Sequence, residues 1–247
     1  MRQEISIPTK DGAMRAFAFT PDTGEGPWPG VIFYMDAPAI RPALFDMGER
    51  IAAHGYVVVM PDLYWRAGAY EPIDMATVRN DEARREAFGR LRASTNPQAQ
   101  MVDTEGALAW LDQEPRAKAD KVGLTGYCMG GGIALRAAAA VPDRIAAAAS
   151  FHGGNLATDE PDSPHRQADQ IKARVLVAGA DEARSFPPEQ KVRLEAALQA
   201  AGVEAEVVIY PGARHGYAPA DMAAYDAEAS ERHWREMFDL FDATLKG

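Results

Sequence analysis

The sequence predicts a doubly wound α/β fold, with a mostly parallel sheet and antiparallel strands at its N-terminal edge. Short apolar runs alternate with amphipathic segments through most of the chain, as in β-α repeats. Two alternating segments, 4–7 and 14–20, flank the turn signal Lys10-Asp11-Gly12 and predict a hairpin at the sheet edge. With 247 residues and 47% hydrophobic content, we expect one domain that spans 1–247.

Continuous apolar runs mark the buried strands. Val31 to Tyr34 and Tyr56 to Met60 lack the alternation of a half-exposed strand, which is typical of parallel strands covered on both faces. Between them a helix begins near Pro42 and stops at Gly55. Further strands are expected at 121–127, 145–151, 174–178 and 206–210, and further helices at 98–111, 129–140, 187–201 and 221–245.

The segment from about 68 to 97 breaks this pattern, because charged residues dominate it and its helical signal faces solvent. We interpret it as a charged helical excursion over the sheet edge, not as a second domain. The aromatic residues Tyr64 and Trp65 precede it, at the carboxyl end of a predicted strand. Ligand sites of open α/β sheets lie at that edge, so both side chains are candidates for substrate binding.

Composition excludes several classes of protein. A formal net charge of −10 argues against nucleic-acid or anionic-membrane partners, which require clustered positive charge. The single cysteine cannot form an internal disulfide, and the first residues lack the apolar core of a signal peptide, so we expect a cytoplasmic monomer or homodimer. No phosphate-loop signature is present, and we expect neither a cofactor nor a metal.

The stretch Gly123 to Gly132 carries the most specific chemical signal. An apolar strand ends at Tyr127, an alanine-rich helix begins at Met129, and Cys128 lies at the sharp turn between them. The pattern Gly-x-Cys-x-Gly resembles the G-x-S-x-G nucleophile elbow of α/β-hydrolases, with sulfur replacing oxygen. A lone cysteine is more often a small buried hydrophobe, but the flanking glycines favour a nucleophile.

The helix that begins after Cys128 should influence the protonation of the sulfur. Its N-terminal N–H groups and positive dipole end are expected to favour thiolate over thiol, and the Met129 N–H is a candidate oxyanion donor.

A nucleophile elbow also requires an acid and then a histidine later in the chain, each after a strand. Asp181 follows the apolar run 175–179, and His215 follows the last predicted strand. We therefore predict a Cys128, His215, Asp181 triad, in which the imidazole takes the thiol proton and the carboxylate orients it. The adjacent Glu182 is the weaker alternative to Asp181.

Of the other histidines, His152 is the main competitor, because it ends a strand just beyond the nucleophile helix. We expect it to line the pocket and not to act as the base, since it precedes the acid in chain order. His54 and His233 read as structural, and His165 has no evident chemical partner.

The chain resembles the dienelactone hydrolase family, the carboxymethylenebutenolidase-like α/β-hydrolases that use cysteine. The resemblance extends over nearly the whole chain. It is carried by Pro61-Asp62-Leu63-Tyr64, by Gly126 to Gly131, by Asp181 and by Tyr210 to Tyr217.

This resemblance implies further roles. Asp36 takes the position of the family's glutamate, which contacts the resting thiol and relays its proton, and the N–H of Ala37 completes the oxyanion hole. Two family arginines hold a substrate carboxylate: Arg85 matches one best, with a surface pair to Asp81 as the alternative. Pro219 occupies the position of the other, so we expect only a modest preference for carboxylates.

We therefore expect a hydrolase that opens a small ester or lactone through a thioester on Cys128, with Tyr217 among the residues that hold the substrate. An acyltransferase, or a non-catalytic ligand-binding protein on the same scaffold, remains the alternative.

Overall fold

The computed structural model describes residues 1–181 and 183–246, except for the side chain of Arg79. Eight strands form one mixed sheet in the order β1-β2-β4-β3-β5-β6-β7-β8. The strands are β1 (Arg2–Thr9), β2 (Gly12–Phe19), β3 (Trp28–Tyr34), β4 (Val57–Pro61), β5 (Ala117–Tyr127), β6 (Ile145–Phe151), β7 (Arg174–Ala180) and β8 (Ala205–Tyr210).

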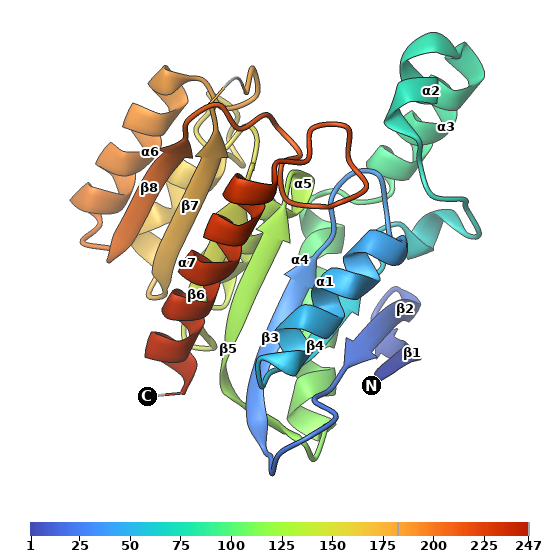
Figure 1. Cartoon of the computed structure of the whole chain (residues 1–247), viewed down its shortest axis with the longest axis vertical. Helices are drawn as coiled ribbons and strands as arrows, with labels where there is room; N and C mark the ends of the chain where they lie inside the picture. The colour runs from blue at the N-terminus through green and yellow to red at the C-terminus, as the bar shows by residue number, and fades with distance from the viewer. Residues whose placement is uncertain (182, 247) are drawn as a thin grey trace.

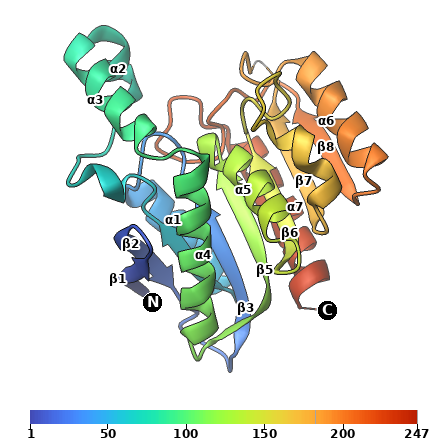
Figure 2. The same cartoon turned by 180° about the vertical axis from the view of Figure 1, so that it is seen from behind.

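Helices cover both faces of this sheet. They are α1 (Pro42–Ala53), α2 (Met75–Asn80), α3 (Glu82–Ala93), α4 (Pro97–Gln113), α5 (Met129–Ala140), α6 (Pro188–Ala200) and α7 (Ala227–Leu245), with short 3₁₀ turns η1 (Trp65–Ala67) and η2 (Pro164–Gln170). Figure 1 shows α1 and α7 over one face, and Figure 2 shows α4 and α5 over the other. This layering confirms the predicted doubly wound architecture.

The N-terminal strands form the predicted antiparallel edge. β1 pairs with β2 in register from Arg2 opposite Phe19 to Thr9 opposite Gly12, and β2 pairs antiparallel with β4. The six strands from β4 to β8 across the sheet are parallel. Their carboxyl ends therefore meet at one edge, where the loops that carry the candidate residues also meet.

The charged segment after β4 becomes the helices α2 and α3, which stand off the body at the end of the sheet toward which the parallel strands point (Figures 1 and 2). Asp74 caps α2 and Asp81 caps α3, each through a side-chain oxygen that accepts a backbone N–H. Only Leu91 is a buried residue of α3, in agreement with the charged sequence.

The last helix begins later than the sequence pattern predicts. We expected it from about residue 221, but α7 starts at Ala227, because the Asp226 side chain accepts the N–H of Ala229 and caps the first turn. The residues between β8 and α7 are therefore a long loop, which carries His215 across the carboxyl edge of the sheet.

Candidate active site

Cys128 lies at a strained turn between β5 and α5. Its backbone has φ 53° and ψ −112°, outside the regions that L-residues normally occupy. The turn brings the start of α5 so close to β5 that only glycine fits there. A Cβ on Gly126 would lie 2.0 Å from the carbonyl oxygen of Gly130. A Cβ on Gly130 would lie 2.3 Å from the carbonyl oxygen of Tyr34. The geometry is that of a nucleophile elbow, for which these glycines are required.

The Cys128 thiol contacts the imidazole of His215. The distance from Nε2 of His215 to Sγ is 3.0 Å, although the residues are 87 positions apart in the chain. His215 reaches the sulfur from the loop after β8, and Cys128 from the end of β5. This is hydrogen-bonding distance for a base that takes the thiol proton.

Two backbone N–H groups also reach the sulfur. Hydrogen bonds from the N–H of Ala37, in the loop after β3, and of Met129, at the start of α5, act on the Cys128 thiol and favour its charged form. Two N–H groups that meet beside a nucleophile can hold the oxyanion of a tetrahedral intermediate. Both residues predicted as oxyanion donors are thus brought to Cys128.

Burial outweighs these N–H groups in setting the protonation of the pair. Burial first, and then the negative charge of Asp36, raise the pKa of the Cys128 thiol above its ordinary value. Burial lowers the pKa of His215. The N–H groups favour the thiolate as expected, but burial outweighs them: both shifts favour a neutral thiol beside a neutral imidazole, because the buried site disfavours separated charges.

Asp181 follows β7, close to the turn that leads to His215, but among the described residues no hydrogen bond joins its carboxylate to the imidazole. Its carboxylate accepts the N–H of Gly212 at 2.8 Å, and its own N–H donates to Ala213 at 2.9 Å. Within the described part of the chain, the buried Nδ1 of His215 has no hydrogen-bond partner. The alternative acid, Glu182, lies outside the described residues.

His152 packs directly against His215. The two rings meet edge to face with centroids 5.2 Å apart, and Tyr217 lies at 5.1 Å on another side of His152. His152 is 1% exposed, and neither ring nitrogen has a hydrogen-bond partner among the described residues. Burial, together with the neighbouring histidines, lowers its pKa well below the ordinary value. The Tyr217 hydroxyl donates to the carbonyl of Ala178, so Tyr217 supports the histidines from behind.

Of the two aromatic candidates after β4, Tyr64 lies at the site and Trp65 contacts a different region. The Tyr64 hydroxyl donates to the carbonyl of Ala37 at 3.1 Å. The Trp65 indole N–H instead donates to Asp103 of α4 at 3.0 Å, and its ring lies against Gly12. Trp65 therefore helps to fix the loop in place, whereas Tyr64 touches the loop that carries an oxyanion donor.

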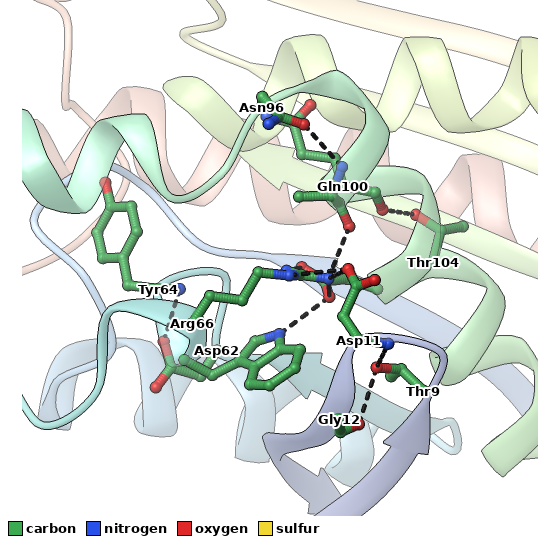
Figure 3. A network of polar contacts seen from close by, with 12 residues as sticks. Thr9, Asp11, Gly12, Asp62, Tyr64, Arg66, Asn96, Gln100 and Thr104 are labelled. Atoms are coloured by element: carbon green, nitrogen blue, oxygen red, sulfur yellow. Dashed lines mark hydrogen bonds and ion pairs between the residues drawn. The ribbon is translucent and has the colours of Figure 1, made fainter.

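A polar network holds this loop to the body of the protein. Arg66 bonds Asp11 of the β1-β2 turn at 2.7 Å and the fully buried Asp103 at 3.0 Å. Figure 3 shows Arg66 directed toward Asp11, with the Tyr64 side chain extending away from them. The network restrains the loop after β4 and does not involve the Tyr64 ring, which points away from it.

The cation that acts on the site is Arg92, at the end of α3. Burial raises the pKa of the Tyr64 hydroxyl, and the charge of Arg92 and a hydrogen bond from it partly oppose that shift; the charge of Arg92 also acts on Cys128. Arg85, the sequence candidate, lies two helical turns earlier and is exposed. Asp81, expected as its surface partner, bonds the backbone of Arg84. Positions 85 and 92 share one helix face, so periodicity alone could not choose between them.

A second cation missed in the sequence is Arg136 of α5. Its Nη2 donates to Gln100 at 2.9 Å, and its buried Nε has no hydrogen-bond partner in the described chain. Burial lowers the pKa of Arg136, which the charge of Asp162 partly offsets and the charge of Arg92 reinforces. No local motif marks this arginine, which occupies one position in an otherwise alanine-rich helix.

Asp36 lies near the thiol but bonds a different partner. Its carboxylate forms two hydrogen bonds with Arg41, at 2.6 and 2.9 Å, and none with Cys128 among the described contacts. A cavity of about 730 Å³ opens beside this pair, lined in part by Arg41, His215 and Asp221. A cavity of similar size, about 760 Å³, lies between α3 and the segment before α2, and neither Cys128 nor His215 lines it.

No group of three or more histidine, cysteine or acidic side chains in residues 1–181 and 183–246 is placed to hold a metal ion. In the same residues, no helix combines the length and apolar character needed to cross a membrane.

Comparisons with known proteins agree with this geometry. The model of the dienelactone hydrolase family matches residues 14–245. The chain belongs to that family. A Synechocystis protein provisionally named carboxymethylenebutenolidase is 30% identical over 98% of this chain and 96% of its own length. A Klebsiella pneumoniae structure provisionally described as a dienelactone hydrolase has a TM-score of 0.85 and 27% identity, with 98% of each chain covered.

More distant structures share the architecture alone. An acylaminoacyl peptidase matches with a TM-score of 0.73 and 18% identity, over 99% of this chain and 42% of its own. The α/β-hydrolase fold is thereby established. As a member of the dienelactone hydrolase family, the protein is a hydrolase of esters or lactones, which favours the enzyme over a non-catalytic binding protein.

Proposed function

We propose that this hydrolase opens a small ester or lactone by covalent catalysis on Cys128. The observation that carries the proposal is the 3.0 Å contact between the thiol and His215 at a nucleophile elbow. The substrate carbonyl would lie beside the sulfur, with its oxygen toward the N–H groups of Ala37 and Met129. This placement brings nucleophile, base and oxyanion donors to one carbon atom.

The reaction then proceeds in two halves. Sulfur attacks the carbonyl carbon while the thiol proton passes to Nε2 of His215, and the C–O bond breaks as the imidazolium protonates the leaving alcohol or enol. Water next attacks the thioester, giving one proton to His215, which returns it to the departing sulfur. Because the resting pair is neutral, proton transfer accompanies attack and does not precede it.

Asp181 completes the proposed triad. Its position after β7 and its bond to Gly212 support a role in placing the His215 loop. The proposal further requires the carboxylate to turn from Gly212 to the unpartnered Nδ1 when the imidazolium forms, where a negative charge stabilises it.

The substrate side of the site supports recognition of a carboxylate by Arg92. This arginine acts on both Tyr64 and Cys128, and Arg136 adds a second positive charge behind it. An anion bound beside Arg92 would relieve the repulsion between the two guanidinium groups. We therefore place the acidic group of a carboxylate-bearing ester between α3 and the nucleophile.

The decisive experiment traps the acyl group. Rapid quench of the wild type with an activated ester, within the first turnover, should give an intact mass increased by one acyl group, because a reactive leaving group makes acylation faster than deacylation. Cys128→Ala should show no adduct and lose at least about a thousandfold in kcat/KM, as expected when a nucleophile is removed.

Hydrolysis by Cys128→Ala at the wild-type rate would contradict covalent catalysis on this residue. Added alcohols distinguish a hydrolase from an acyltransferase. If product esters form in preference to the free acid, the acyl group is transferred to the alcohol and not to water.

A further inference from the structure

Arg41 joins two carboxylates beside the candidate nucleophile. Its Nη1 and Nη2 donate to Asp36 at 2.6 and 2.9 Å, and its Nε and Nη2 donate to Asp221 at 2.6 and 3.1 Å. A further bond runs from Nη1 to the carbonyl of Ala39 at 3.0 Å. These bonds use all the donors that a guanidinium has.

The environment makes this arrangement energetically important. Asp36 is 2% exposed and Arg41 is 7% exposed, whereas the Asp221 side chain is 41% exposed. A buried carboxylate that loses its cation is strongly destabilised and seeks another hydrogen-bond donor or a proton. The charge of Asp36 already acts on the Cys128 thiol.

Arg41 also connects two parts of the site along the chain. Asp36 and Ala37 follow β3, so the bond to Asp36 restrains the loop whose Ala37 N–H reaches the sulfur. Asp221 lies six residues after His215 in the loop before α7, so the bond to Asp221 restrains the loop that carries the base. One guanidinium therefore holds an oxyanion loop against the histidine loop.

Several charged or titratable groups face the thiol from different elements. They are Asp36 after β3, Tyr64 after β4, Arg92 on α3 and His215 after β8, and the positive charge of Arg41 lies behind Asp36. Among the described residues that act most strongly on the sulfur, Asp36 is the acidic one. Its charge opposes formation of a thiolate, unless a cation balances it.

We propose that Arg41 is a positioning residue for this active site: it holds Asp36 off the Cys128 thiol, balances its charge and keeps the Ala37 and His215 loops together. The thiol proton is then left to His215. Asp36, in this arrangement, serves as an anchor for Arg41 and not as a proton relay. The inference rests on the proposed nucleophilic role of Cys128 and adds to it the means by which the cysteine-histidine pair is maintained.

The test measures the thiol directly. Cys128 is the only cysteine, so the rate of alkylation by iodoacetamide as a function of pH reports on this sulfur alone. In Arg41→Met, Asp36 loses its cation and its pKa rises further, but at the alkaline pH of the thiol midpoint it is ionised, so its unbalanced charge should move that midpoint upward by about one pH unit. Arg41→Lys retains the positive charge but not the paired geometry, and should shift the midpoint less than Arg41→Met does.

A double variant separates charge from structure. Asp36→Asn combined with Arg41→Met removes both members of the buried pair and should restore the alkylation profile to within about threefold of the wild type. Arg50→Met is the matched control, since Arg50 forms an exposed ion pair with Glu231 and its removal should leave the profile unchanged. Circular dichroism and thermal melting establish that each variant is folded.

An unchanged profile in folded Arg41→Met would overturn the proposal. So would a double variant that remains as slow as Arg41→Met, or Arg41→Lys shifted as far as Arg41→Met, because either result would show that the charge on Asp36 is not the cause. Hydrolysis by Cys128→Ala would refute the covalent mechanism separately, since alkylation measures the thiol whether or not it carries the acyl group.

Discussion

At the scale of single residues, the central feature is a thiol and an imidazole that face each other in their neutral forms. The helix dipole and two N–H groups favour a thiolate, yet burial of Cys128 and the charge of Asp36 raise the thiol pKa. The same burial lowers the pKa of His215. In the proposed mechanism, His215 would therefore be available as a general base over a wider acidic range than an exposed histidine.

This protonation state predicts the pH dependence of hydrolysis. Only neutral His215 accepts the thiol proton, so kcat/KM should fall as the pH decreases through its lowered pKa, with the acidic limb below about pH 6.5. The profile is measured with a neutral ester, whose own charge does not change with pH.

The position of that limb also tests the role of Asp181. A limb centred above about pH 6.5 would mean that a carboxylate stabilises the imidazolium of the working enzyme, and Asp181→Asn should then return it to lower pH. A limb that lies below that value and is unaffected by Asp181→Asn would leave Asp181 as an anchor of the Gly212 turn.

At the scale of elements, the docking of α3 determines which of its cations would reach a substrate in the proposed mechanism. An α-helix rises 1.5 Å per residue, so Arg85 and Arg92 lie on the same face about 10 Å apart along its axis. The end of α3 that joins α4 approaches Tyr64 and the nucleophile, whereas the rest of the α2-α3 hairpin stands away from the body (Figure 1). Arg92 is thus placed at the reaction centre by the docking of the helix, not by its sequence neighbours.

We therefore predict that Arg92→Ala lowers kcat/KM about tenfold for a carboxylate-bearing ester and much less for the corresponding methyl ester. One charge-assisted hydrogen bond justifies that magnitude, reduced for the exposure of Arg92 to solvent. Higher salt should reduce the difference between the two esters.

Arg85→Ala serves as the comparison, since the family resemblance favours that position. Selective loss of the carboxylate preference in Arg85→Ala, with Arg92→Ala unaffected, would reinstate Arg85 as the carboxylate ligand.

At the scale of the whole molecule, the packing of α7 against the sheet supports the strand that carries Cys128. His233 of α7 is completely buried, with one ring nitrogen on the Tyr127 hydroxyl at the end of β5 and the other on the carbonyl of Ser230. Burial lowers the pKa of His233 to about 3. The helix therefore packs behind the nucleophile strand through a histidine that remains neutral.

This arrangement predicts sensitivity to acid. The unfolded chain binds a proton at His233 below about pH 6.5, whereas the folded chain does so only near 3. The stability that depends on neutral His233 is thus fully present above about pH 6.5 and is lost as the pH falls toward the folded value. Between pH 7 and 5, this residue alone should cost about 2 kcal/mol.

Urea unfolding of the wild type and of His233→Gln, each at both pH values, measures that loss. The variant should lose about 2 kcal/mol less than the wild type on acidification, even if it is less stable overall. Equal losses in the two proteins would show that His233 does not contribute to the acid sensitivity.

The sequence by itself determined the order of the elements, the nucleophile elbow and the pairing of Cys128 with His215. These follow from local chemistry: apolar runs form buried strands, glycines permit the close approach beneath Cys128, and the fold requires the base after the last strand. Met129 was a candidate oxyanion donor from the predicted helix start and Ala37 from the family resemblance, and the structure brings the N–H groups of both to the sulfur.

Tertiary structure alone decided which side chains act on that sulfur, and in what state. The choice of Arg92 over Arg85, the engagement of Asp36 by Arg41 and the position of Asp181 on Gly212 all depend on how separate loops pack. The protonation of Cys128 depends on burial, which outweighs a helix dipole that the sequence does reveal. Coulombic interactions and desolvation act through space. A pattern along the chain therefore identifies candidate side chains, but it does not show which electrostatic effect sets the protonation of Cys128.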